Sequence, residues 1–140
     1  ENWMGEGGSL NHAPLGSAID EWFYSDLAGI QPDPDAPGYK SIIFKPYLPD
    51  DLPWAQATVQ TMRGTIRSAW RKDGKQAEWH ITVPANSRGV VHVPCNDPAK
   101  INEQNQPAAE AQGVHLVESN DDQTIYHVES GEYRFTFPAP

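Results

Sequence analysis

The stretch GTIRSAWRKDGKQAEWHITVP, residues 64–84, constrains the fold more than any other part of the chain. Two runs in which apolar and polar residues alternate flank the pair Asp73-Gly74. An Asp-Gly pair between two such runs is typical of a tight β-hairpin. In this hairpin Trp70 and Trp79 would face each other, in phase with apolar neighbours that predict core packing. The sequence therefore predicts an antiparallel hairpin with one buried face.

Short segments with strand character continue on both sides of this hairpin, at residues 39–46, 57–64, 88–94, 124–130 and 131–138. The 13 prolines and 11 glycines of the chain supply frequent turns between them. We expect the last two segments to form a hairpin around Ser130-Gly131, and the polar stretch 97–113 to hold at most one short strand. Roughly eight short strands with turns between them predict a mostly β fold, an antiparallel β-sandwich.

The N-terminal part of the chain has a different pattern. Residues 1–14 are rich in glycine and predict a loop, whereas residues 15–30 carry apolar side chains at helical spacing. Gly29 is placed to end this helix with a left-handed residue. The segment QPDPDAPG, residues 31–38, then predicts a rigid extended connection, so we place a domain boundary near residue 31. Such a helix needs a partner for its apolar stripe, either the sandwich or helices outside this chain.

Charge and composition exclude several classes of partner. The formal net charge of -9 argues against nucleic acid or an anionic membrane, because both attract clustered lysine and arginine. No apolar run approaches the ~18–20 residues that cross a membrane. Neutral ligands such as sugars remain possible. Cys95 is the one cysteine, so no intrachain disulfide is possible, and we expect a half-buried structural thiol.

Few residues of the chain suggest chemistry by their spacing alone. Glu1 and His12 fit a general base and a group that contacts a substrate hydroxyl, although a loop pair of this kind is more often a pair of surface residues. The other histidines lack metal-ligand spacing, the acidic loops do not match a calcium loop, and no phosphate loop follows a strand. We therefore expect no metal and no cofactor. Trp54 lies in a predicted loop, where an exposed indole is suited to stacking on a sugar.

Several segments, taken in order, resemble the C-terminal end of bacterial α-L-rhamnosidases of glycoside hydrolase family 78. They are ENW at residues 1–3, GGSLNHAPLGSAIDEWFYSDLAGI at 7–30, APGYKSIIFKP at 36–46, GTIRSAW at 64–70, ITVPANSRGVVHVP at 81–94 and SGEYRFTF at 130–137. Each motif is moderately specific, and the ordered series covers nearly the whole chain.

The resemblance implies an architecture and a chemistry. Family members have a catalytic barrel of six α-helical hairpins followed by a β-sandwich, so residues 1–30 would be the last loop and helix of the barrel and residues 31–140 the sandwich. Glu1 matches the glutamate taken as the general base, and His12 matches a histidine that contacts the sugar. These enzymes invert the anomeric centre, which requires two carboxyl groups roughly 6.5–9.5 Å apart. The general acid would lie upstream of Glu1.

Two functions follow as hypotheses. In the first, the chain is the C-terminal portion of an inverting α-L-rhamnosidase that removes terminal α-L-rhamnose from glycosides or polysaccharides. Its sandwich is mainly structural, its partner is the upstream barrel of the same protein, and the 140-residue chain alone is inactive. That role predicts that Trp22 and Phe23 are exposed in the isolated chain. The alternative is a non-catalytic, carbohydrate-binding β-sandwich module.

Overall fold

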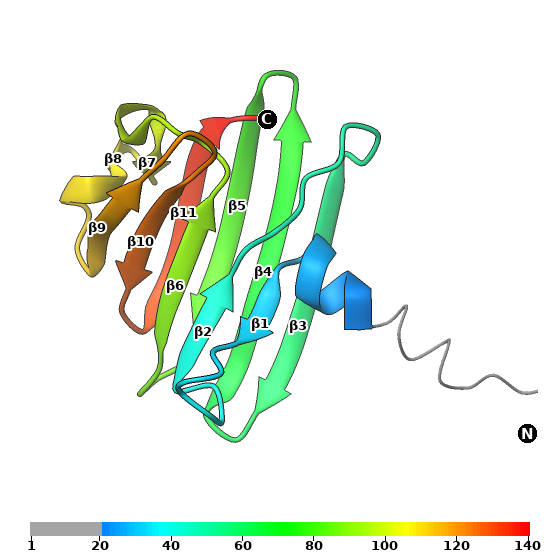
Figure 1. Ribbon diagram of the computed structural model, residues 1–140, viewed down its shortest axis with the longest axis vertical. Coiled ribbons are helices and arrows are strands. Elements are labelled where there is room, and N and C mark those ends of the chain that lie inside the picture. Colours follow the sequence, from blue (N-terminus) through cyan, green and yellow to red (C-terminus); the bar gives the residue numbers. More distant parts are fainter. Residues whose placement is uncertain (1–20) are drawn as a thin grey trace, which may run out of the picture.

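The computed structural model describes residues 21–140, which form two β-sheets packed face to face (Figure 1). The core between the sheets contains large side chains from both of them. Tyr126 from one sheet stacks on Phe135 from the other, with ring centroids 6.1 Å apart. The predicted β-sandwich is therefore confirmed. No helix among residues 21–140 combines the length and the apolar character needed to cross a membrane.

One sheet has six strands in the order β3-β4-β5-β11-β7-β8, and all its neighbours are antiparallel. The strands are β3 (Trp54–Thr61), β4 (Gly64–Asp73), β5 (Gln76–Val83), β11 (Gly131–Pro138), β7 (Asn102–Glu103) and β8 (Gln106–Pro107). The hairpin predicted around Asp73-Gly74 is confirmed, because Asp73 pairs with Gln76 and Gly74 adopts a positive φ of 60°. Trp70 pairs with Trp79, and both are buried.

The other sheet has five strands in the order β1-β2-β6-β10-β9. They are β1 (Ile30–Pro32), β2 (Ser41–Phe44), β6 (Arg88–Val93), β10 (Thr124–Val128) and β9 (Val114–Ser119). The expectation of a purely antiparallel sandwich is wrong at one place, because β2 and β6 are parallel. The chain leaves β2, runs through β3, β4 and β5 in the opposite sheet and returns as β6 (Figure 1). The chain reverses its direction at each of the four links between β2 and β6, and β6 therefore runs parallel to β2.

The hairpin predicted around Ser130-Gly131 is also wrong. Strands β10 and β11 follow each other directly, but β10 pairs with β6 and β9 whereas β11 pairs with β5 and β7. Each strand buries alternate residues, and such strands can pack face to face across a core as well as edge to edge in one sheet. The short link between them therefore crosses from one sheet to the other.

The region between β6 and β10 contains more structure than the sequence predicts. The stretch 97–113 holds two strands, β7 and β8, where at most one was expected, and two 3-10 turns, η2 (Pro98–Lys100) and η3 (Ala108–Glu110). Strand β9 was not predicted. Only its first residue, Val114, is buried, so the strand lacks the alternation of apolar residues that reveals the others.

The described end of the predicted N-terminal helix is a π-helical turn, η1 (Phe23–Leu27), in which the Ala28 N–H donates to the Phe23 carbonyl at 3.0 Å. The helix over 15–30 was expected to be α-helical, and its first part lies outside the described residues. Gly29 ends the helix at a φ of 71°, as predicted. Leu27 and Ile30 enter the core of the sandwich.

Candidate functional site

The two residues singled out for catalysis, Glu1 and His12, lie outside the described residues, so their roles stay predictions. Trp70 and Trp79 are core residues, as their phase predicts, whereas Trp54 is 59% exposed. Trp54 is the first residue of β3, whereas a loop was expected at this position. The Cys95 thiol is half-buried and donates to the Asp97 carbonyl at 3.5 Å, which confirms a structural thiol. Trp54 is therefore the candidate that the described part of the chain places at the surface.

The outer face of the six-stranded sheet carries side chains in registered rows around Trp54. In one row Trp54 of β3 is opposite Arg71 of β4, which is opposite Glu78 of β5. Residues opposite each other in an antiparallel pair have Cβ atoms ~4.5–5.5 Å apart, so neighbours in a row can interact. The alternation that buries Trp70 and Trp79 thus presents polar partners of Trp54 to solvent.

The next row contains Gln56, Ala69 and His80, on the same three strands. The small side chain of Ala69 leaves an open hollow between these rows, with a volume of about 610 Å³. We call it the Trp54 hollow; it is lined by Trp54, Gln56, Arg67, Ala69, Arg71, Lys72, Glu78 and His80, together with Pro53, Ala55 and Trp70. An aromatic ring beside several convergent polar groups is the usual make-up of a small-ligand site.

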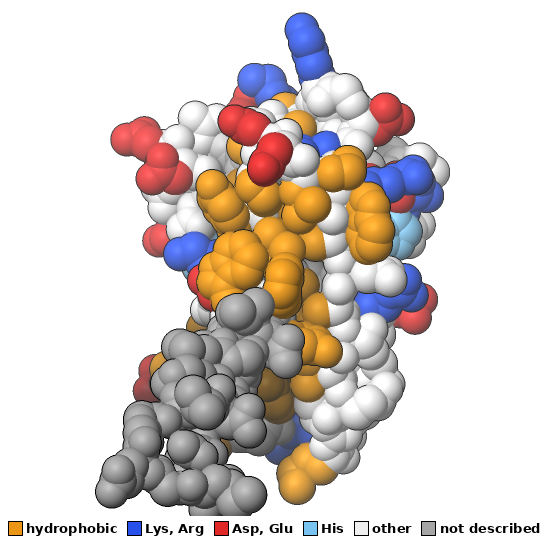
Figure 2. All heavy atoms as spheres, turned by 90° about the vertical axis from the view of Figure 1, so that its right-hand side faces the viewer, with side chains coloured by type: hydrophobic (Ala, Val, Ile, Leu, Met, Phe, Trp, Pro, Cys, Tyr) orange, Lys and Arg blue, Asp and Glu red, His pale blue; other side chains and the backbone are white. Residues whose placement is uncertain are grey.

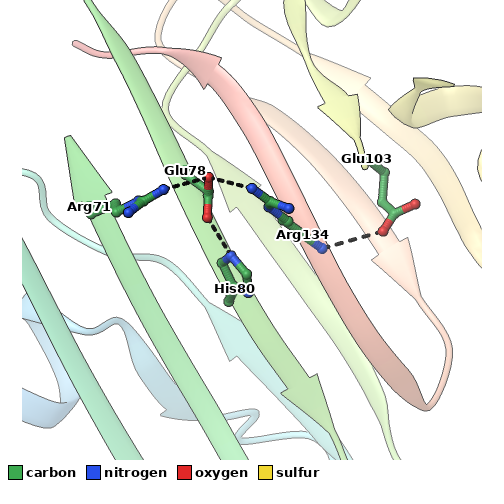
Figure 3. Close-up of polar contacts among 5 residues, drawn as sticks. All are labelled: Arg71, Glu78, His80, Glu103 and Arg134. Atoms are coloured by element: carbon green, nitrogen blue, oxygen red, sulfur yellow. Dashed lines mark hydrogen bonds and ion pairs between the residues drawn. The ribbon is translucent and has the colours of Figure 1, made fainter. Parts of the chain in front are cut away.

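Glu78 is the centre of the polar network on this face (Figure 3). Its Oε2 accepts from Arg134 at 2.9 Å and from Arg71 at 3.2 Å, and its Oε1 contacts His80 Nε2 at 2.6 Å. The hydrogen bonds from Arg134 and then His80 lower the pKa of Glu78 from 4.5 to about 2. In turn, the same carboxylate raises the pKa of Arg134. Glu78 is therefore ionised and held in one orientation.

Arg134 links this network to a second carboxylate, because its backbone N–H donates to Glu103 Oε1 at 3.3 Å (Figure 3). Glu103 is buried and lies on β7, the strand beside β11. The sequence contains no local signal for this network as a whole. The hairpin register around Asp73-Gly74 contained a signal for the Arg71–Glu78 pair, but nothing in the sequence shows that β11 lies beside β5.

The other described histidines lie apart from the Glu78 network. His92 Nδ1 lies 3.2 Å from Gln123 Oε1, and burial lowers the pKa of His92. His115 Nε2 lies 3.9 Å from Glu129 Oε1 at an exposed position. Within residues 21–140 no group of three or more histidine, cysteine, aspartate or glutamate side chains is arranged to hold a metal ion.

A second surface feature is apolar. Trp22, Phe23 and Tyr24 at η1 and Tyr47 after β2 are each 45–60% exposed, and we call them the η1 patch. Trp22 and Phe23 contact each other edge to face at 5.5 Å, and the Tyr47 N–H donates to the Asp26 carbonyl at 2.8 Å. Figure 2 shows hydrophobic side chains gathered on the side of the molecule that carries η1 and β3. The predicted exposure of Trp22 and Phe23 is confirmed.

This fold and its sequence match known proteins. A sequence model of the bacterial alpha-L-rhamnosidase C-terminal domain matches residues 29–108, and the chain belongs to this family. Two alpha-L-rhamnosidases, from Streptomyces avermitilis and Formosa agariphila, are each 28% identical to it over 91% of the chain. The chain spans only 11% and 13% of the lengths of these relatives.

Solved structures give the same result. An alpha-L-rhamnosidase from "Dictyoglumus thermophilum" superposes with a TM-score of 0.73 at 32% identity, over 88% of this chain and 14% of that one. The Streptomyces avermitilis alpha-L-rhamnosidase, solved with L-rhamnose, superposes with a TM-score of 0.73 at 24% identity, over 85% of this chain and 11% of that one. The second likeness concerns the fold alone. The chain is thus a C-terminal rhamnosidase domain, as the sequence motifs indicated.

Proposed function

We propose that this chain is the C-terminal portion of an inverting α-L-rhamnosidase that hydrolyses terminal α-L-rhamnose from glycosides or polysaccharides. The observation that carries the proposal is the match of residues 29–108 to the C-terminal domain of bacterial alpha-L-rhamnosidases. The chain spans only 11% and 13% of the lengths of the related alpha-L-rhamnosidases, which supports a catalytic domain elsewhere in the same protein. Residues 1–30 would then come from the end of a six-hairpin barrel and residues 31–140 would form the sandwich, with Leu27 and Ile30 at the junction packed into the core of the sandwich.

In this proposal Glu1 acts as the general base and His12 contacts the sugar. An inverting base removes a proton from a water molecule on the face of the sugar opposite the leaving group. A separate carboxylic acid must protonate the leaving oxygen, and that acid would come from the catalytic domain. The 140-residue chain alone should therefore not hydrolyse an aryl α-L-rhamnoside.

The test uses a longer protein that contains this chain together with its upstream region. We expect it to hydrolyse an aryl α-L-rhamnoside and to release β-L-rhamnose first, as followed by proton NMR of the anomeric signal. Glu1→Gln should lower kcat by roughly 100-fold or more, and His12→Ala should mainly raise KM. Release of α-L-rhamnose would contradict the inverting mechanism. Hydrolysis by the 140-residue chain alone would contradict the proposal that the general acid comes from a separate catalytic domain.

The sandwich itself we propose to be a packing module that meets the catalytic domain through the η1 patch. Three neighbouring aromatic side chains on one helical turn, with Tyr47 beside them, form a surface of the kind that marks an interface. In the 140-residue chain, the double variant Trp22→Ser/Tyr47→Ser should bind less of a hydrophobic dye than the parent. In the longer enzyme, Tyr47→Asp should lower the melting temperature, whereas Met62→Asp at a turn outside the patch should not. Equal melting temperatures would contradict the packing role.

A further inference from the structure

The Trp54 hollow differs from the η1 patch in chemistry and in position. It lies on the outer face of the six-stranded sheet, and its lining combines one exposed indole with charged and amide side chains. The packing role of the sandwich uses none of these residues. The packing role therefore does not account for the exposed tryptophan and the charged side chains of the hollow.

The charge of the hollow is opposite to that of the chain. The chain has 19 acidic and 10 basic residues, yet the lining contains the guanidinium groups of Arg67 and Arg71 against the single carboxylate of Glu78. Lys72 also lines the hollow, but its ammonium donates to the Pro49 carbonyl. Glu78 is already engaged by Arg71, Arg134 and His80. The surplus positive charge around Trp54 is the feature that an anionic ligand would meet.

Hydrogen-bonding capacity is also left over at this site. Arg71 uses one terminal nitrogen for Glu78, and a guanidinium has five N–H donors in a rigid fork. Among the residues that the structure describes, the side chains of Gln56 and Arg67 form no hydrogen bond with one another or with a third residue. The ion pair with Glu78 on the neighbouring strand holds the Arg71 side chain in place. Arg71 is therefore ordered before a ligand binds, which lowers the entropic cost of binding.

Trp54 provides the remaining component. A half-exposed indole has an apolar face on which the C–H groups of a sugar ring pack, and Arg forks bind carboxylates in a bidentate manner. We propose that the Trp54 hollow binds an acidic oligosaccharide, in which one sugar ring stacks on Trp54 and separate carboxylates of the oligosaccharide pair with Arg71, opposite Trp54, and with Arg67 further along β4. The carbohydrate nature of the ligand rests on the proposed function, whereas the choice of an acidic sugar rests on the charge of the hollow.

The experiment titrates the 140-residue chain with three acidic probes, oligogalacturonate, alginate and hyaluronan oligosaccharides, and with neutral maltohexaose. The readout is the indole N–H signal of Trp54 in nitrogen-15 NMR spectra, assigned by its loss in Trp54→Phe. We expect at least one acidic probe to shift this signal at millimolar concentration or below, and maltohexaose not to shift it. Binding should weaken as the salt concentration rises from about 0.05 M to 0.5 M, because ionic contacts are screened.

Variants separate stacking from charge. Trp54→Ala and Arg71→Gln should each weaken binding by about tenfold. Met62→Ala, at a 93% exposed turn position outside the hollow, should change nothing, and the melting temperatures of all variants show whether they are folded. Equal binding of maltohexaose, or no response to any acidic probe at about 10 mM, would overturn the proposal. Neither outcome affects the rhamnosidase proposal, since that proposal depends on hydrolysis by the longer protein.

Discussion

The indole N–H of Trp70 donates a 2.8 Å hydrogen bond to the carbonyl oxygen of Leu27, the last residue of η1. The next carbonyl along the chain, that of Ala28, accepts from Ser68 Oγ at 2.6 Å. Carbonyls at the end of a helix lack partners within the helix and must find others. Two side chains of β4 satisfy them here, so the end of the helix is fastened to the six-stranded sheet.

Removal of the Ser68 hydroxyl should break two buried hydrogen bonds, one to the Ala28 carbonyl and one from the Trp79 indole. Ser68 Oγ also accepts the indole N–H of the buried Trp79 at 2.9 Å, so Ser68→Ala leaves a buried donor and a buried acceptor without partners. We expect the free energy of unfolding to fall by about 2–3 kcal/mol, measured by urea denaturation. Ser25→Ala removes an exposed hydroxyl and should change it by less than about 0.5 kcal/mol. Similar values for the two variants would refute the importance of this connection.

Gly29 and Gly38 provide a matched pair for testing how tightly the helix end packs. Their φ angles are 71° and 70°, so an alanine is strained to the same extent at either position. A Cβ at Gly29 would lie 2.2 Å from the Pro46 nitrogen, whereas a Cβ at Gly38 meets nothing within 4 Å. Gly38→Ala should lower the free energy of unfolding by about 1 kcal/mol, the cost of a left-handed conformation for alanine. The melting temperature should therefore fall only modestly. Gly29→Ala should prevent folding or lower the melting temperature much further. Equal melting temperatures for the two variants would contradict the close packing of Gly29 against Pro46.

Two buried tyrosines should respond in opposite ways to loss of their hydroxyl groups. The Tyr126 hydroxyl is buried without a hydrogen-bond partner among the described residues, and burial raises its pKa to about 12. The Tyr133 hydroxyl donates to the Glu129 carbonyl at 3.1 Å. Tyr126→Phe should leave the free energy of unfolding unchanged or raise it, whereas Tyr133→Phe should lower it by about 1 kcal/mol. Thermal or urea denaturation distinguishes these outcomes, and a large loss in Tyr126→Phe would reveal a partner for its hydroxyl.

Glu78 should make the stability of the sandwich depend on acid. Its pKa is about 2 in the folded chain and 4.5 ordinarily, so its contribution is present above pH 4.5 and is lost as the pH falls toward 2. Because Arg71, Arg134 and His80 are at least half exposed, solvent screening reduces that contribution to about 1 kcal/mol. Glu78→Gln should show a smaller loss of stability over this range in pH-dependent urea denaturation. Glu132→Gln, on the same sheet face, should behave as the parent does.

The parts of the fold that the sequence predicts are those in which neighbours in the chain pair with each other. The Asp73-Gly74 hairpin, the buried faces of Trp70 and Trp79 and the left-handed Gly29 all follow from local patterns. The parallel pairing of β2 with β6 and the separation of β10 from β11 depend on which sheet a strand joins. An alternating pattern reports that one face is buried, and it contains no information about which sheet buries it.

The same distinction applies to the candidate site. The sequence predicts that Trp54 is exposed, but in a loop, whereas it is the first residue of β3. Its pairing with Arg71 depends on a hairpin between β3 and β4 that the sequence did not predict, because residues 57–64 have the character of a single strand. Arg134 reaches Glu78 from β11, which is 56 residues further along the chain. Such a contact between distant segments has no local signature. The charge of the hollow could thus be found only after the strands were arranged in space.

The positions of β10 and β11 affect how the sandwich is made during translation. Each lies between two strands that precede it in the chain, β10 between β6 and β9 and β11 between β5 and β7. A ribosome therefore releases every neighbour of these two strands before the strands themselves. Until residues 124–138 emerge, the nascent chain has two unfinished sheets with open edges, so we expect the sandwich to close late and to need protection from aggregation until then.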